Sequence, residues 1–238
     1  MKVKGTSGLI KLRISMHHSY KVLSYGGGVN STALLFYLID NDYDIDEVIF
    51  ADTGAELPET YRYIRKIINY CDKNDIKFSI VMNDTDIYTW YWNHRKIPVR
   101  NRRSCSDLFK IRPIYRYLRR LNAKQVVAYL GIAYDEKKRA KESSRKYIKN
   151  VYPLVENKIN REECKQIIHS HGFQIPPKSG CYFCPFQPER SWYYLLNNHP
   201  DLFKKAMLLE ENGTAYPRLT LSRKKRLRDI WEEKYGSC

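Results

Sequence analysis

The sequence predicts an α/β fold: a doubly wound, mainly parallel sheet with helices on both faces, plus a small C-terminal helical module that contains cysteines. Two observations predict the sheet. Short runs of β-branched and aromatic residues alternate with amphipathic stretches, and three consecutive glycines join the first such run to the first helix. A third observation sets the module apart, because prolines bracket a Cys-x-x-Cys (CxxC) loop late in the chain. Strands that alternate with helices pair in parallel and are covered on both faces.

The expected strands are short apolar runs, each followed by a glycine or a polar residue. They span residues 20–25, 47–51, 77–82 and 125–130. The first helix is expected over residues 31–40, with Asn30 or Ser31 as its N-cap, and the second opens at Pro58.

Composition predicts the larger organisation of the chain. Residues 83–103 are aromatic and basic without a clear period, which favours a substrate-facing loop over a core element. Residues 1–150 are expected to form a nucleotide-binding domain. Residues 151–238 are expected to form a C-terminal module, with the CxxC loop and basic helices, packed on that domain.

The charge is strongly basic: 42 Lys and Arg against 26 Asp and Glu give +16. Such an excess suits a polyanionic partner such as nucleic acid, although a solvated basic surface has the same composition. No apolar run reaches the roughly 20 residues that span a bilayer, and the first 20 residues lack the pattern of a signal peptide. We therefore expect a cytoplasmic protein without a membrane segment.

The sequence Ser24-Tyr25-Gly26-Gly27-Gly28-Val29-Asn30-Ser31 places glycines between a strand and a helix. Glycine lets backbone N–H groups approach a phosphate, and the helix N-terminus adds a positive dipole end. Ser31 and Thr32 add hydroxyl donors. The pattern matches neither the Gly-Lys-Ser/Thr phosphate loop nor the Gly-x-Gly-x-x-Gly dinucleotide loop. A flexible hinge is the other interpretation of these glycines.

The glycine loop (Gly26–Ser31) resembles the pyrophosphatase loop, or PP-loop, of the adenine nucleotide α-hydrolase superfamily. The chain as a whole resembles that superfamily's phosphoadenosine phosphosulfate (PAPS) reductase-like branch. Four further segments carry this resemblance, and they follow in the branch's order: Asp52-Thr53-Gly54 with Pro58-Glu59-Thr60, Cys105–Pro113, Gly131–Glu136 with Tyr152-Pro153-Leu154, and Gly180–Phe186.

The resemblance implies ATP bound with Mg²⁺, cleavage between its α- and β-phosphates, and transfer of AMP to an acceptor oxygen. The implied nucleotide-binding residues are Ser24, Tyr25, Gly26, Gly27, Gly28, Asn30, Ser31, Thr32, Asp52, Thr53, Gly54 and Gly131. Asn30, Ser31 and Cys105 are implied to act in catalysis. Lys110 and Arg112, with Arg139, are candidates for cations that stabilise the phosphoryl charge.

The loop departs from the family pattern at two positions. Gly26 replaces the family's first serine, and Asn30 replaces its aspartate. Asn30 still forms hydrogen bonds but carries no charge towards a metal-bound pyrophosphate.

Cys105, Cys181 and Cys184 are the candidate metal ligands. A CxxC pair with a third cysteine fits a [4Fe-4S] cluster with one open iron, a Zn²⁺ site, or unmetallated thiols such as a redox pair. Similar three-cysteine clusters occur in the iron–sulfur tRNA thiolation enzymes of the superfamily. Cys71 is expected to be a packed thiol. The residues considered as a fourth zinc ligand are Cys164, His169, His171 and Cys238.

Three basic stretches, 95–124, 137–149 and 218–228, interleave with aromatic residues, which suits single-stranded or looped nucleic acid. The first hypothesis is therefore an ATP-dependent adenylylating sulfurtransferase that acts on tRNA or on a DNA phosphate, with sulfide or a sulfur donor protein. A PAPS or adenylyl-sulfate reductase is the second, although the reductases' Glu-Cys-Gly-x-His tail is missing. A catalytically weakened nucleotide-binding module, suggested by Asn30, is the third. A homodimer is left open.

Overall fold

The computed structural model describes residues 19–100, 104–215 and 219–236. Its centre is a five-stranded sheet in the order β3-β2-β1-β4-β5, and every pair of neighbouring strands is parallel. The strands are β1 (Tyr20–Tyr25), β2 (Glu47–Asp52), β3 (Lys77–Met82), β4 (Val126–Leu130) and β5 (Ile148–Val151). The predicted fold class and the four predicted strands are confirmed, and β5 is an addition.

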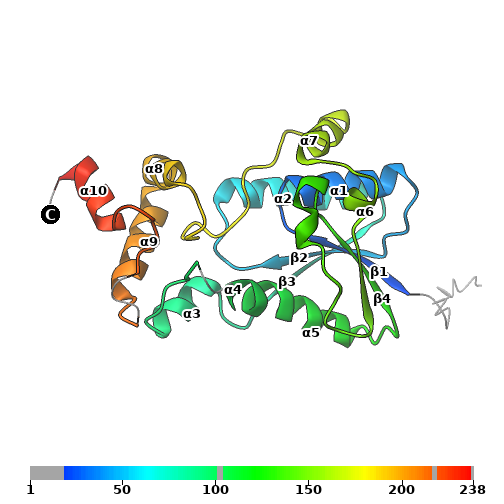
Figure 1. Ribbon diagram of the computed structural model, residues 1–238, viewed down its shortest axis with the longest axis horizontal. Coiled ribbons are helices and arrows are strands. Elements are labelled where there is room, and N and C mark those ends of the chain that lie inside the picture. The colour runs from blue at the N-terminus through cyan, green and yellow to red at the C-terminus, as the bar shows by residue number, and fades with distance from the viewer. Residues whose placement is uncertain (1–18, 101–103, 216–218, 237–238) are drawn as a thin grey trace, which may run out of the picture.

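Helices cover both faces of the sheet because side chains of each strand alternate between two cores. Val48 and Phe50 of β2 belong to one core, and Ile49 and Ala51 to the other. The first core is closed by α1 (Val29–Asp40), α2 (Pro58–Lys73) and α7 (Arg161–Ser170). The second is closed by α5 (Arg112–Arg120) through Leu118. Figure 1 shows α1, α2 and α7 on one side of the sheet and α5 on the other.

A third core joins α3 (Ile87–Asn93), α8 (Glu189–Asn198), α9 (Pro200–Asn212) and α10 (Leu227–Tyr235). Trp192 is its largest fully buried side chain, followed by Phe109, Phe183 and Phe203. In Figure 1, α8, α9 and α10 lie at the end of the molecule far from the start of β1. The C-terminal helical module is therefore present, with the CxxC loop between it and the sheet.

The interpretation of residues 83–103 as a loop is wrong for residues 87–93, which form the helix α3. Asp86 accepts a hydrogen bond from Thr89 N at 3.0 Å and caps α3. The helix buries Ile87 and Tyr91, one turn apart, in the third core. Two buried positions are too few to establish a period in the sequence. Residues 101–103 of the segment lie outside the described residues.

The chain just beyond residue 150 packs on the sheet domain. Leu154 of the short α6 (Pro153–Glu156) and Cys164 and Ile168 of α7 are buried in the first core. The domain boundary at residue 150 stays a prediction, since α6 and α7 share a core with α1. Among the described residues, no helix combines the length and apolarity needed to cross a membrane.

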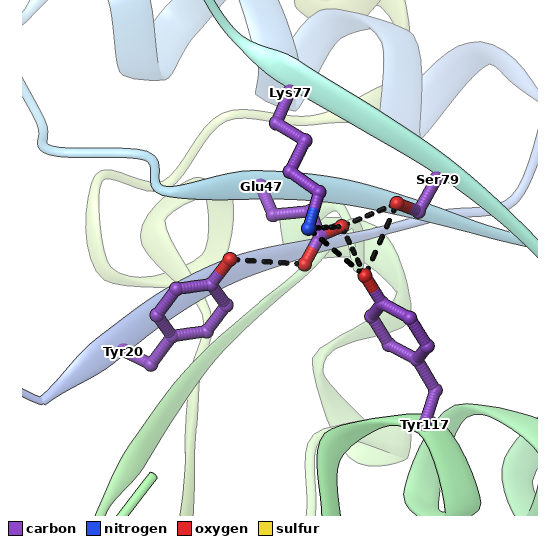
Figure 2. A network of polar contacts seen from close by, with 5 residues as sticks. All are labelled: Tyr20, Glu47, Lys77, Ser79 and Tyr117. Carbon is purple, nitrogen blue, oxygen red and sulfur yellow. Dashed lines mark hydrogen bonds and ion pairs between the residues drawn. The ribbon is translucent and has the colours of Figure 1, made fainter. Parts of the chain in front are cut away.

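Glu47 is a fully buried carboxylate at the start of β2 that ties four elements together (Figure 2). It accepts hydrogen bonds from Tyr20 of β1 at 3.1 Å, from Tyr117 of α5 at 2.6 Å and from Ser79 of β3, and it pairs with Lys77 Nζ at 3.0 Å. Burial opposes the charged form. The hydrogen bonds from Ser79 and Tyr117, with the Lys77 ammonium, outweigh burial and hold the pKa of Glu47 below its ordinary value.

We expect Glu47→Gln to lower the free energy of unfolding at neutral pH by about 1–3 kcal/mol, because several buried donors lose a charged acceptor. A carboxyl whose folded pKa is depressed stabilises the protein above its unfolded pKa, and this contribution disappears as the pH falls through the folded pKa. The free energy of unfolding, measured with urea, should therefore fall more steeply below about pH 5 for the wild type than for the variant. Glu162→Gln, at an exposed pair with Lys165, is the control. Equal pH slopes for wild type and Glu47→Gln would contradict the assignment.

Candidate active site

The glycine loop turns sharply between β1 and α1. Gly27 has φ +72°, a conformation that L side chains rarely adopt. Gly28 is the N-cap of α1. Its carbonyl accepts hydrogen bonds from Thr32 N at 3.0 Å and from Ser31 Oγ at 3.1 Å. The prediction of Asn30 or Ser31 as N-cap is therefore wrong by two to three residues, because a glycine with extended backbone serves that role.

The loop lies where the order of the sheet reverses, between β1 and β4. In open parallel sheets, such a switch point leaves a crevice at the carboxyl ends of the strands. Gly131 follows β4, and a Cβ added there would lie 2.8 Å from both Ser31 N and Ser31 Cα. Gly131 therefore lies beside the loop, as expected, and only a glycine permits this approach.

One large cavity of about 1150 Å³, the main cavity, extends from the glycine loop to the CxxC loop (residues 176–188) and α8. Its lining brings together both ends of the site predicted from the sequence. The predicted residues that line it are Ser24, Gly26, Gly28, Asn30, Ser31, Gly131, Cys105, Cys181 and Cys184.

Other predicted nucleotide-binding residues do not line the main cavity. The side chains of Tyr25 and Thr32 are buried and contact each other, with Tyr25 Oη 3.1 Å from Thr32 Oγ1. Gly27 packs towards Ile64 and Ser179 instead.

Asp52, Thr53 and Gly54, at and just after the end of β2, do not line the main cavity either. Asp52 accepts hydrogen bonds at 2.8 Å from Tyr61 Oη and from Gly54 N. Thr53 is buried, and its Oγ1 lies 3.5 Å from Cys181 Sγ. Thr53 thus supports the thiol end of the site rather than the glycine loop.

Asn30 lies between a carboxylate and a guanidinium that the sequence analysis missed. Its amide donates to Glu136 Oε2 at 3.0 Å, and its Oδ1 accepts from Arg161 at 3.1 Å. Glu136 also pairs with Arg139. The match of Gly131–Glu136 to the family pattern was the one signal in the sequence that pointed to Glu136. The same two residues, Asp135-Glu136, are also typical of an ordinary turn.

The cations of the main cavity differ from those expected. Arg139 lines it, as predicted, and Arg161, Lys165 and Lys178 line it as well. Arg112 does not: it is largely exposed and pairs with Asp107 at 2.8 Å. The structure therefore does not bring Arg112 to the glycine loop.

Lys110 is held behind the CxxC loop. It lies in a π-helical turn (Asp107–Ile111), and its Nζ is 3.5 Å from Glu56 Oε1. Glu56 is buried; its Oε2 accepts from Gly180 N at 2.5 Å, and its Oε1 has no hydrogen bond. Burial alone would lower the pKa of Lys110, but the Glu56 carboxylate raises it above its ordinary value. Lys110 is thus a permanent cation beside the CxxC loop.

Cys105, Cys181 and Cys184 line one cavity, and Cys184 N donates to the Cys181 carbonyl at 2.9 Å. Burial raises the pKa of Cys181 to about 12 and raises that of Cys184 as well. Three thiols on one cavity are suitable ligands for iron or zinc. A bound metal ion would displace the thiol protons. Within residues 19–100, 104–215 and 219–236, however, no three His, Cys, Asp or Glu side chains are grouped closely enough to hold a metal ion.

The remaining sulfur and imidazole candidates serve packing or lie elsewhere. Cys71, as expected, and Cys164 are fully buried in the first core. His171 stacks on Phe36 with ring centroids 4.3 Å apart. His169 lies in the last turn of α7 and is exposed. Cys238 lies outside the described residues.

Residues 21–175 match the phosphoadenosine phosphosulfate reductase domain family. An uncharacterised protein of Methanocaldococcus jannaschii is 24% identical over 201 residues, which cover 76% of this chain and 45% of that protein. The chain thus spans about half the length of this curated relative.

The solved structures that match the chain include a reductase and, at a lower TM-score, a thiolase. PAPS reductase from Candida auris, in complex with phosphate, is 14% identical with a TM-score of 0.52, and the match covers 70% of this chain and 83% of the reductase. The U34-tRNA thiolase NcsA from Methanococcus maripaludis, solved with its [4Fe-4S] cluster, is 15% identical with a TM-score of 0.47, covering 93% of this chain and 83% of the thiolase.

We expect Gly131→Ala to lower the free energy of unfolding by about 1–3 kcal/mol and to weaken ATP binding, because its Cβ would displace the start of α1. Denaturant unfolding and calorimetric titration with ATP measure the two effects. Gly26→Ala is the control for stability, because a Cβ there would meet only Ser31 Oγ, at 3.7 Å. If Gly131→Ala were as stable as the wild type, Gly131 and the Ser31 backbone would have to lie further apart than described.

We expect Lys110→Met to destabilise the protein by about 1–3 kcal/mol, because a buried carboxylate loses its cation. Adding Glu56→Gln should recover most of this loss. The ATP dissociation constant should stay within about twofold of the wild-type value. A large rise in that constant, with no recovery in the double variant, would instead place Lys110 on the phosphates.

Proposed function

Because the chain belongs to the phosphoadenosine phosphosulfate reductase domain family, we propose that it is an ATP-dependent adenylylating sulfurtransferase acting on nucleic acid. The reaction would be of the tRNA thiolation or DNA phosphorothioation type. ATP pyrophosphatase chemistry, which forms AMP, supplies the activation, and the cysteines support the sulfur step.

One observation carries this proposal: the glycine loop and the three cysteines share a single cavity. A nucleotide at one end and thiols at the other suit two consecutive steps on one acceptor. An acceptor activated near Ser31 remains inside the same cavity when it reaches Cys181.

Several features of the described residues support the binding of a triphosphate. Backbone N–H groups at the start of α1 and the positive end of its dipole face the main cavity. Arg139, Arg161 and Lys165 add positive charge around it. Glu136 lines the cavity and would help to hold Mg²⁺, which would supply positive charge to the phosphates.

The chemistry balances without an external oxidant or reductant when the sulfur donor is hydrosulfide. The acceptor oxygen attacks the α-phosphorus of ATP, the bond to the bridging α,β-oxygen breaks, and pyrophosphate leaves. Hydrosulfide then attacks the carbon or phosphorus that carries the adenylated oxygen. The bond to that oxygen breaks, AMP leaves with the electron pair, and the sulfur loses its proton.

Cys105, Cys181 and Cys184 line one cavity, and they would hold a [4Fe-4S] cluster, or alternatively Zn²⁺, once their thiols are drawn closer together. A cluster with an open iron supplies a binding place for hydrosulfide when it is present. The chain's own contribution is the position of the thiols: Glu56 fixes Gly180 of the CxxC loop, and Thr53 contacts Cys181.

The net charge supports nucleic acid as the partner, and the free cysteines support a cytoplasmic location. A net charge of +16 favours a polyanionic acceptor. The five cysteines in the described part of the chain are free thiols, as expected in a reducing, ATP-containing cytoplasm, where we place the protein.

Pyrophosphate release measures the first step. We expect incubation with ATP to release pyrophosphate only when bulk nucleic acid is added, and to release AMP as well when hydrosulfide is also present. Cys181→Ser and Cys184→Ser should keep pyrophosphate release but abolish sulfur incorporation, as read by mass spectrometry of nucleosides. Cys71→Ala, outside the main cavity, is the matched control. Release that is independent of nucleic acid would contradict the proposed acceptor.

Metal content tests the ligands separately. Anaerobically purified protein should contain iron, and Cys181→Ser should lower that content. Unchanged iron in Cys181→Ser would remove this residue from the ligand set. Sulfite formation from PAPS with a thiol reductant, without any response to nucleic acid, would instead identify a reductase.

A further inference from the structure

A second cavity of about 610 Å³ lies next to the main cavity, on the other side of the first turn of α2. It is lined by side chains from α2, α3 and α9, together with Tyr182 of the CxxC loop. Tyr182 lines both cavities, and it directly follows Cys181. The second cavity is therefore adjacent to the thiol end of the candidate active site.

Three cations face this cavity: Arg62 and Arg65 on one side of α2, and Lys205 of α9. Within the described part of the chain, none of the three forms an ion pair with a carboxylate. Some cations elsewhere in the described residues, such as Lys77 and Arg112, do have a carboxylate partner. Three unpaired cations around one cavity repel one another, and a bound anion would relieve that repulsion.

The two carboxylates that line the cavity are already engaged. Asp86 accepts a hydrogen bond from Thr89 N and caps α3. Glu56 accepts from Gly180 N and pairs with Lys110. Neither is paired with Arg62, Arg65 or Lys205, so the three guanidinium and ammonium groups remain available to a ligand.

Aromatic rings complete the cavity. Tyr88 and Tyr182 both line it and stack on each other with centroids 6.4 Å apart and planes at 29°. Tyr88 also stacks on Trp92. Burial raises the pKa of Tyr88 and of Tyr182, so both rings stay neutral beside an anion. Aromatic faces beside unpaired cations are the combination that binds a base together with its phosphate.

We propose that the second cavity binds a nucleotide unit, with its phosphate on Arg62, Arg65 and Lys205 and its base against Tyr88 and Tyr182. This inference rests on the proposed function in one respect: it identifies the unit as a neighbour of the modified nucleotide in a nucleic-acid acceptor. A free nucleotide has the same chemistry, and the experiment separates the two sources. The cavity thereby becomes a positioning site that presents the acceptor to the main cavity.

The decisive comparison uses two triple variants of equal charge. Arg62→Ala/Arg65→Ala/Lys205→Ala removes the cations of the cavity. The control, Lys66→Ala/Lys73→Ala/Lys204→Ala, removes three cations from the same two helices that line neither cavity. Both sets are exposed, so both variants should fold, as checked by circular dichroism and thermal melting.

Binding is measured by fluorescence anisotropy with a labelled single-stranded oligonucleotide of roughly 12 nucleotides, at several salt concentrations. The cavity variant should bind about tenfold more weakly than the control, and its slope of log affinity against log salt should fall by about 2. Tyr88→Leu should weaken binding while leaving the salt slope unchanged. Equal losses in the two triple variants would overturn the proposal, as would failure of the wild type to bind.

Two further measurements separate this inference from the proposed function. ATP titration should give the same affinity for both triple variants, because the glycine loop is unaltered. Competition with adenosine 3′,5′-bisphosphate tests the free-nucleotide source. Cavity-dependent binding of that compound alone would keep the nucleotide site and overturn the nucleic-acid acceptor. Cavity-dependent oligonucleotide binding without pyrophosphate release would keep the site and overturn the proposed reaction.

Discussion

The close approach of Gly131 to Ser31 is the constraint on which the rest of the site depends. The sheet reverses its order between β1 and β4, so the segments that follow these two strands must share one place. A Cβ on Gly131 would lie 2.8 Å from the Ser31 backbone, so the strand end and the start of α1 are in direct contact. That contact fixes the direction of α1 and opens the main cavity at the carboxyl edge of the sheet.

Two buried carboxylates show how the ends of the sheet differ. Glu47, at the amino end of β2, accepts hydrogen bonds from three hydroxyls and pairs with an ammonium. These contacts join β1, β2, β3 and α5 at that end of the sheet. Glu56, beyond the carboxyl end of the same strand, keeps one oxygen without a hydrogen bond and faces Lys110 and the CxxC loop. That oxygen lies 3.5 Å from Lys110 Nζ, so the charge of the buried carboxylate is balanced by an ammonium rather than by hydroxyl donors. The chain places this ion pair next to Cys181 and Cys184.

The sequence predicts those features that depend on neighbours in the chain. The four strands and the glycine turn are recognisable because period, β-branching and glycine act locally. Helix α3 was missed because only Ile87 and Tyr91 reveal its buried side. The contacts of Asn30 with Glu136 and Arg161 span 106 and 131 positions, and no local pattern encodes such pairings. Lys110 was expected at the phosphates, yet the π-helical turn directs it to Glu56.

Asn30 is the departure from the family pattern that first suggested a weakened nucleotide-binding module. A carboxylate is present beside the loop after all, but Glu136 supplies it from the segment after β4. An aspartate at position 30 would accept from Arg161 as Asn30 does, but it would repel Glu136. The Asn30 amide both donates to the carboxylate and accepts from the guanidinium, which a carboxylate at this position could not do. Asn30 and Glu136 are therefore a matched pair, with the amide in the glycine loop and the negative charge on its neighbour in the same cavity.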